Sequence, residues 1–259
     1  MKKKCTNVWL PRVPKTGSTG ILTACKHSRS FVQVTDSSTD ISEQEFIERE
    51  YQQYKQYHSE TFKQFPVYIY QNDIMSRSGK ECQIIGGHGS ALFTTEMHGW
   101  TKILSIRDPA SRFRSLYRFR AIDTNHVVPV QEWTEYSSVL SWLNERQRRY
   151  NQLEFRDADD IATAFDHYID VTMGHKVEGI IRALGHDLPN ISEHTRYKWA
   201  NRTDTRLSLL SRENQLLLDE QLTLLPIQMI NNEEYQKDVE LYEKFKQQAS
   251  NIAYKYARL

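Results

Sequence analysis

The chain has 259 residues, and its 34 Lys and Arg residues nearly balance its 33 Asp and Glu residues, so the formal net charge is +1. This balance excludes a general polyanion-binding protein, because non-specific nucleic-acid binding requires a marked excess of positive charge. Hydrophobic residues at 39% are enough for a packed core, whereas 10 Gly and 7 Pro are too few for a disordered or fibrous chain. The composition predicts a globular protein in which any bound anion is held by a local cluster of cations.

The sequence contains neither a membrane-spanning pattern nor a metal-binding motif. No stretch approaches the roughly 20 consecutive apolar residues of a membrane helix, so we expect no membrane segment. The three cysteines, Cys5, Cys25 and Cys82, lie outside any C-x-x-C pattern, which predicts neither a disulfide framework nor a zinc site. No histidine pair has the spacing of metal ligands, so we expect no catalytic metal.

Short β-rich or apolar runs alternate with helical patterns along the chain. Strands are expected at Val8–Leu10, Phe31–Val34, Val67–Tyr70, Ile84–Ile85, Lys102–Ile106 and His167–Thr172. Helices are expected at Asp40–Gln64, from Pro109 onward, and at Trp133–Tyr150, Lys176–Leu184, Ser211–Leu225 and Glu233–Tyr256, with a loop at Glu193–Thr205. This alternation predicts an α/β protein with a mainly parallel central sheet flanked by helices. No linker or repeat divides it, so residues 1–259 are expected to form a single domain.

The first candidate site lies between the first strand and a helix, in the segment Arg12-Val13-Pro14-Lys15-Thr16-Gly17-Ser18-Thr19. Unpaired N–H groups at a helix N-terminus carry partial positive charge and suit a phosphate. The glycine permits close approach, the lysine adds a full charge, and the hydroxyls are donors. The lysine precedes the glycine, so the order is not that of a Walker A loop. The alternative is an ordinary helix start capped by Ser or Thr.

The second candidate site follows the buried strand at Lys102–Ile106, which delivers Arg107 to its carboxyl end. In open α/β sheets ligands bind in the crevice at that end. A guanidinium can grip a phosphate in two places, and Ser115 on the following helix can add a hydroxyl donor. The alternative is that Arg107 pairs with Asp108 or another acid.

Together these two segments resemble the PAPS-dependent carbohydrate sulfotransferases, especially the uronyl and heparan sulfate 2-O-sulfotransferase branch. Arg12 to Thr19 resembles that family's 5′-phosphosulfate-binding loop, and Arg107 with Ser115 resembles its 3′-phosphate-binding segment. The resemblance implies a P-loop-like sulfotransferase fold, with PAPS (3′-phosphoadenylyl sulfate) as co-substrate and PAP as product.

The resemblance also implies a role for each matching residue. Lys15 would lie over the 5′-phosphosulfate and stabilise charge on the leaving bridge oxygen, and Arg107 and Ser115 would hold the 3′-phosphate. The 5′-phosphate would be bound by Thr16, Gly17, Ser18 and Thr19, while Arg12 matches the arginine that precedes the family's loop.

A base must remove the proton of the acceptor hydroxyl, and His88 is the best placed of the nine histidines. It follows Ile84–Ile85 in a glycine-flanked turn, and imidazole is an effective base near neutral pH. His88-Gly89-Ser90 also resembles the segment that carries the catalytic histidine of the 2-O-sulfotransferases. This sequence departs from that branch at Gly86, where a further histidine is frequent.

Two further basic segments bear on the ligands. A cluster formed by Arg112, Arg114, Arg118, Arg120, Arg146, Arg148 and Arg149 could face an anionic glycan, and the alternative is a solvated helix face. Arg196, Lys198 and Arg202 lie where the family has a loop that closes over the nucleotide, which makes them further candidates for cofactor binding.

The sequence therefore predicts a PAPS-dependent sulfotransferase that transfers the sulfuryl group to an acceptor hydroxyl, expected to be that of a carbohydrate. The alternatives are a catalytically silent glycan- or nucleotide-binding module on the same scaffold, and a P-loop kinase-like phosphotransferase using Asp108 to bind magnesium. A cytoplasmic location is expected from the lack of an anchor, and the Golgi lumen is the alternative if a native anchor has been removed. The acceptor, the position sulfated and the oligomeric state are not encoded in any pattern that we recognise.

Overall fold

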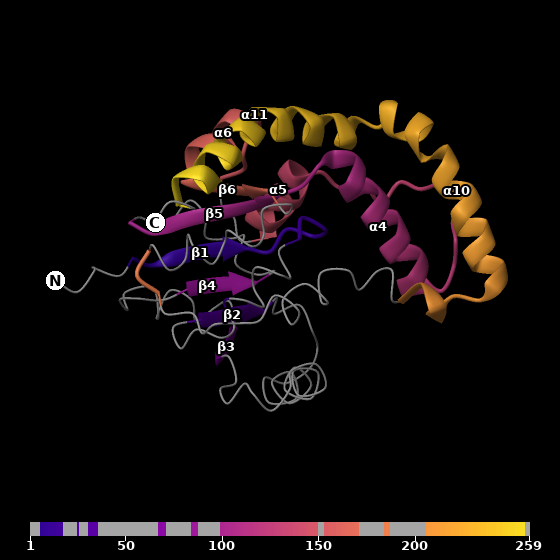
Figure 1. Cartoon of the computed structure of the whole chain (residues 1–259), viewed down its shortest axis with the longest axis horizontal. Coiled ribbons are helices and arrows are strands. Elements are labelled where there is room, and N and C mark those ends of the chain that lie inside the picture. Colours follow the sequence, from indigo (N-terminus) through magenta and orange to yellow (C-terminus); the bar gives the residue numbers. More distant parts are fainter. Residues whose placement is uncertain are drawn as a thin grey trace.

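The computed structural model describes residues 6–17, 25, 31–35, 67–70, 84–87, 99–149, 153–170, 184–186 and 206–256. Its strands are β1 (Val8–Pro11), β2 (Phe31–Thr35), β3 (Val67–Tyr70), β4 (Ile84–Gly87), β5 (Thr101–Ile106) and β6 (His167–Asp170). They form one sheet in the order β3-β2-β4-β1-β5-β6 (Figure 1). Every pairing is parallel, as the alternation of strands and helices predicts. The expected α/β architecture is confirmed, while the assignment of all 259 residues to one domain stays a prediction.

Strand β1 lies at the centre of the sheet between β4 and β5. In its register with β4, Val8 faces Ile84 and Pro11 faces Gly87, and Val8 also pairs with Thr101 of β5. The side chains of all four β1 residues are buried. Both faces of the central strand are therefore covered, which accounts for its uninterrupted apolar sequence.

Helix α4 (Pro109–Thr124) starts directly after β5 for a local reason. The carboxylate of Asp108 accepts a hydrogen bond of 2.8 Å from the Ser111 N–H, and Pro109 occupies the first helical turn, where a missing N–H costs nothing. The helix ends at Asn125, whose φ of 51° places it in the left-handed region, where asparagine is tolerated. Sequence and structure agree on where this helix begins.

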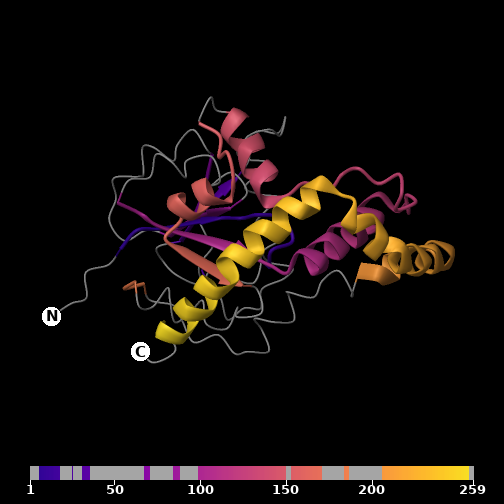
Figure 2. The same ribbon diagram turned by 90° about the horizontal axis from the view of Figure 1, so that it is seen from above.

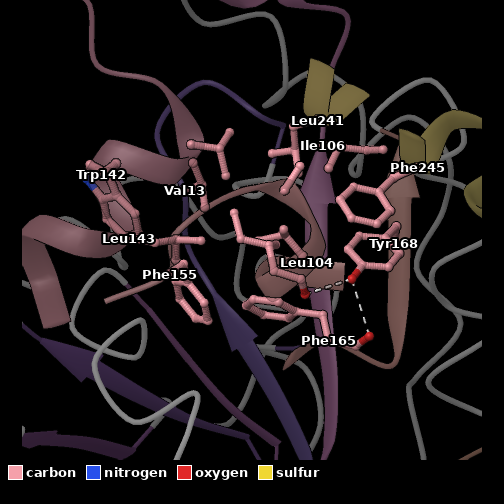
Figure 3. Packing of buried hydrophobic residues seen from close by; sticks show 13 residues of the cluster. Val13, Leu104, Ile106, Trp142, Leu143, Phe155, Phe165, Tyr168, Leu241 and Phe245 are labelled. Carbon is pink, nitrogen blue, oxygen red and sulfur yellow. Dashed lines mark hydrogen bonds between the residues drawn. The ribbon is translucent and has the colours of Figure 1, made fainter. Parts of the chain in front are cut away.

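The main core lies between the sheet and the helices α5 (Val139–Arg149), α6 (Ala158–Ala164) and α11 (Glu233–Tyr256). Figure 3 shows it, with Tyr168 of β6 stacked on Phe245 of α11 at a centroid distance of 3.9 Å. The Tyr168 hydroxyl donates to the Ile161 carbonyl at 3.0 Å, which ties β6 to α6. In Figure 2, α11 crosses the sheet obliquely, with α5 and α6 on one side and α4 on the other.

A second cluster lies beyond the carboxyl ends of the strands, where α4 packs against α10 (Arg212–Ile230), as Figure 1 shows. Phe113 and Tyr117 of α4 meet Trp133 there at centroid distances of 5.0 and 5.1 Å, and Leu225 of α10 is fully buried. A short 3-10 turn, η4 (Leu207–Leu209), precedes α10. None of the described helices combines the length and apolar character needed to cross a bilayer.

Two predicted helix boundaries are wrong. The helix expected from Trp133 begins only at Val139, because Ser138 provides its N-cap and accepts a hydrogen bond of 3.1 Å from the Ser141 N–H, while Trp133 packs in the second cluster. Helix α10 continues past Leu225 and Pro226 to Ile230. Pro226 removes one backbone hydrogen bond of the helix, and burial of Met229 in the second cluster offsets this loss of stability.

Local patterns also left some elements unpredicted or untested. Helix α6 had no predicted counterpart, although Asp157 caps it by accepting hydrogen bonds from the Asp159 and Asp160 N–H groups. The helices expected at Asp40–Gln64 and Lys176–Leu184 lie outside the described residues, apart from Leu184 itself, and so does the whole loop expected at Glu193–Thr205.

Candidate functional site

The candidate site lies at the point where the connections of the sheet reverse direction. From β1 the chain proceeds to β2 on one side, whereas from β5 it proceeds to β6 on the other. In open α/β sheets ligands bind at the carboxyl ends of two adjacent strands whose connections diverge in this way. The turn at Arg12 to Gly17 follows β1, and Arg107 follows β5. The two predicted anion sites thus belong to one edge of the sheet.

A buried pair of hydroxyls fastens the turn to β5. The side chain of Thr16 is fully buried, and its Oγ1 donates to the Val13 carbonyl at 3.0 Å. The same oxygen lies 2.7 Å from Oγ of Ser105, which is 89 residues away in the sequence. Because its proton is used on Val13, the Thr16 hydroxyl holds the turn in place, and the group that Thr16 can offer a ligand is its backbone N–H.

The carbonyl oxygens of the turn face the protein. Arg112 Nε donates to the Pro14 carbonyl at 3.2 Å, and Arg107 Nη1 donates to the Lys15 carbonyl at 3.4 Å. In a trans peptide the N–H points opposite to the C=O, so the N–H groups of Lys15 and Thr16 point away from these guanidinium groups. Two successive amides on the outer side of a turn are suited to an anion.

The backbone of the turn supports the same geometry. Lys15 has φ of 62° and Gly17 has φ of 75°, while Thr16 between them is not in the positive-φ region. Alternation of this kind brings successive N–H groups into one concavity. The left-handed conformation is unfavourable for lysine and is held here by the hydrogen bonds to Val13, Pro14 and Lys15.

The Lys15 ammonium group lies over the ring of Phe119, with Nζ 3.6 Å from the ring centroid. Burial, together with repulsion from Arg12, Arg206 and Arg107, lowers the pKa of Lys15 to about 8, and Asp123 partly opposes this shift. Arg206 also lies near Phe119, with Cζ 5.9 Å from the centroid. Three arginines therefore raise the positive potential at Lys15, which favours an anionic ligand.

Ser115 and Phe119 lie one turn apart on α4, so both project from the same side of this helix. Since Phe119 contacts Lys15, this side of α4 faces the turn. Ser115 is half-buried. Its predicted place beside the Arg107 and Lys15 segments is therefore consistent with the helix geometry.

The structure brings together the described members of the predicted site and leaves the others untested. Arg107 contacts Lys15 and contributes, with Arg12, to its electrostatic surroundings. The Asp108 carboxylate caps α4 by accepting a hydrogen bond from the Ser111 N–H, and the alternative in which Arg107 pairs with Asp108 or another acid stays untested. The remaining predicted site residues lie outside the described residues: Ser18, Thr19, His88, Arg196, Lys198 and Arg202.

Three members of the predicted basic cluster have acidic partners in the structure. Arg112 is 1% exposed and pairs with Asp238, whereas Arg120 pairs with Glu135 on the surface. Arg148 pairs with Glu154. Arg112 is therefore withdrawn from any surface that could face a ligand, while Arg120 and Arg148 are paired with acids at the surface.

Three residues of the site were missed by sequence reasoning. Ser105 carries a detectable signal, because it is a polar residue within a buried strand. Phe119 could have been found from its spacing of four residues from Ser115. Arg206 has no local signal, since its proximity to Lys15 depends on how the chain returns before α10.

Within the described part of the chain, no group of three or more His, Cys, Asp and Glu side chains could hold a metal ion. The described groups at this sheet edge are cations, hydroxyls and outward amides. Comparison with known proteins gives no assignment: no model of a protein family matches the chain, and no curated protein or solved structure matches it significantly.

Proposed function

We propose that the chain is a PAPS-dependent sulfotransferase that transfers a sulfuryl group to the hydroxyl of an acceptor, most simply a carbohydrate. The observation that carries the proposal is the contact of Arg107 Nη1 with the Lys15 carbonyl at 3.4 Å. PAPS has phosphate groups at both the 3′ and 5′ positions of one ribose, so its two anion-binding elements must be neighbours. Here the two elements, 92 residues apart in the sequence, meet at one sheet edge.

The charges around Lys15 support the same ligand. A sulfuryl donor leaves negative charge on the bridge oxygen of the departing nucleotide, and fixed positive groups stabilise that charge most effectively when they are in place beforehand. Lys15 and the outward amides of Lys15 and Thr16 supply such groups, and Arg12 and Arg206 add positive potential. Arg107 and Ser115 are the groups proposed for the 3′-phosphate.

The proposed reaction is an in-line displacement at sulfur. The acceptor oxygen forms a bond to sulfur as the imidazole of His88 takes its proton, and the bond from sulfur to the bridge oxygen breaks. The electron pair stays on the 5′-phosphate of PAP, next to Lys15. Strand β4 ends at Gly87, opposite Pro11 of β1, and His88 is the next residue in the sequence.

The test is incubation of the protein with ³⁵S-labelled PAPS and a panel of glycans and small alcohols. The proposal predicts transfer of label to at least one acceptor, without added metal. His88→Ala should abolish most turnover and leave PAP affinity nearly unchanged, because a base acts on the acceptor and not on the nucleotide. Equal loss of both would refute the role of His88.

The same experiment separates the rivals. Binding of PAP without transfer to any acceptor would identify a silent binding module, and magnesium-dependent turnover of ATP would identify a phosphotransferase. A carbohydrate acceptor and a cytoplasmic location are part of the proposal, and the acceptor panel tests the first of these directly.

A further inference from the structure

A charged side chain is buried directly behind the candidate site. Arg112, in the first turn of α4, is 1% exposed. Its guanidinium donates to the Pro14 carbonyl at 3.2 Å, the Tyr136 hydroxyl at 2.9 Å and the Ser137 carbonyl at 2.9 Å, and it pairs with Asp238. One guanidinium therefore joins the turn after β1 to the segment before α5 and to the C-terminal helix α11.

Asp238 holds Arg112 from the other side. It is 3% exposed, accepts a hydrogen bond of 2.7 Å from the Val139 N–H, and also accepts from the Tyr136 hydroxyl. The Arg112–Asp238 ion pair is thus buried, and its hydrogen bonds fix the orientation of both side chains. A buried ion pair generally adds little stability compared with apolar side chains of similar size, so its value here lies in the geometry that it imposes.

The ion pair fixes the orientation of one peptide group, the one between Pro14 and Lys15. The Pro14 carbonyl and the Lys15 N–H belong to the same trans peptide and point in opposite directions. Pro14 has no N–H, so the Lys15 amide is the first donor that the turn can offer after Val13. Holding the Pro14 carbonyl against Arg112 therefore aims the Lys15 N–H away from the protein interior.

We infer that Arg112, Tyr136 and Asp238 are positioning residues, which orient the Lys15 peptide for anion binding through the Pro14 carbonyl. Helix α11 thereby acts on the site without contacting the ligand. The inference deepens the proposed function and rests on it for the identity of the anion, while the orientation of the turn can be measured without any ligand.

The test compares three variants that change the anchoring of the same segment. Arg112→Met combined with Asp238→Asn removes both charges together and leaves no buried charge unpaired. Tyr136→Phe removes one hydroxyl of the network and is the milder variant, should the double variant fail to fold. Glu234→Ala is the matched control, because Glu234 also anchors α11 to this segment, accepting from the Ser138 N–H at 2.9 Å, without touching Arg112.

Two readouts are taken on each variant: the affinity for PAP by calorimetry, and the ¹⁵N order parameters of Lys15, Thr16 and Gly17 in the free protein. We expect the double variant to bind PAP about tenfold more weakly, the change equivalent to one hydrogen bond to a charged group. Its order parameters should fall at these three residues and stay unchanged in β1. Tyr136→Phe should show the same changes to a smaller extent, and Glu234→Ala should show neither.

The outcomes distinguish the inference from the proposed function. Unchanged order parameters in both Arg112-network variants, or equal changes in the Glu234→Ala control, would overturn the inference even if the wild type binds PAP. If the wild-type protein fails to bind PAP, the proposed function is wrong, and the order parameters alone decide whether the network positions the turn.

Discussion

The bond between Thr16 and Ser105 holds the turn against β5, and replacing these two residues gives a quantitative test of that arrangement. Thr16→Val keeps the shape of the side chain and removes an oxygen that makes two buried hydrogen bonds, of 3.0 Å to Val13 and 2.7 Å to Ser105. At about 1 kcal/mol for each bond, unfolding should become easier by about 2 kcal/mol. Ser105→Ala removes only the shared bond and should cost about 1 kcal/mol.

The double variant distinguishes a real contact from two independent effects. If the two hydroxyls are hydrogen-bonded to each other, the variant with both Thr16→Val and Ser105→Ala loses the shared bond only once. The sum of the stability losses of the two single variants should then exceed the loss of the double variant by about 1 kcal/mol. Urea unfolding followed by circular dichroism measures all four proteins. Thr163→Val is the control, because its exposed hydroxyl donates to Asp159 at 3.0 Å on the surface, and it should change stability by less than about 0.5 kcal/mol. Strictly additive costs at Thr16 and Ser105 would refute the placement of the turn.

Three further variants or conditions test the site. Because the pKa of Lys15 is lowered to about 8, PAP affinity should fall as pH rises from 7 to 9, a fall that calorimetry should not detect in Lys15→Arg; a flat wild-type profile would contradict the pKa. As the pH rises, Lys15 releases its proton at a lower pH in the folded protein than in the unfolded chain, so its contribution to the free energy of unfolding should increase between about pH 8 and 10.5. Denaturant titrations should show this increase in the wild type and not in Lys15→Met. Asp108→Asn keeps an N-cap acceptor and should preserve melting temperature and sulfuryl transfer, whereas Asp108→Ala should cost about 1 kcal/mol; an Asp108→Asn variant as unstable as Asp108→Ala would contradict the capping role.

Local signals in the sequence predicted much of the framework. The strands at Val67–Tyr70 and Thr101–Ile106 follow from β-rich composition, and the start of α4 follows from Asp108 and Pro109. These features depend on neighbouring residues. The two segments expected to bind anions were likewise singled out by short motifs, and the parallel order of the sheet then places them at one edge.

The errors arose where distant residues decide the structure. Arg112 was predicted to lie in a basic cluster that faces either a glycan or solvent, but its partner Asp238 lies 126 residues later. The start of α5 is set at Ser138, whose N–H and hydroxyl both donate to Glu234 of α11. The residues close to Trp133 and Arg112 in the sequence do not include these partners. A prediction from local periodicity therefore started the helix too early and placed the arginine at the surface.

The central claim is that the turn after β1 and Arg107 bind opposite ends of one nucleotide, and isothermal titration of two ligands tests it most directly. PAP and adenosine 5′-monophosphate differ only in the 3′-phosphate. The account predicts that the wild type prefers PAP, that Arg107→Ala loses this preference while still binding the monophosphate, and that Lys15→Ala weakens both ligands. An Arg107→Ala variant that retains the full preference for PAP, or a wild type that does not distinguish the two nucleotides, would contradict it.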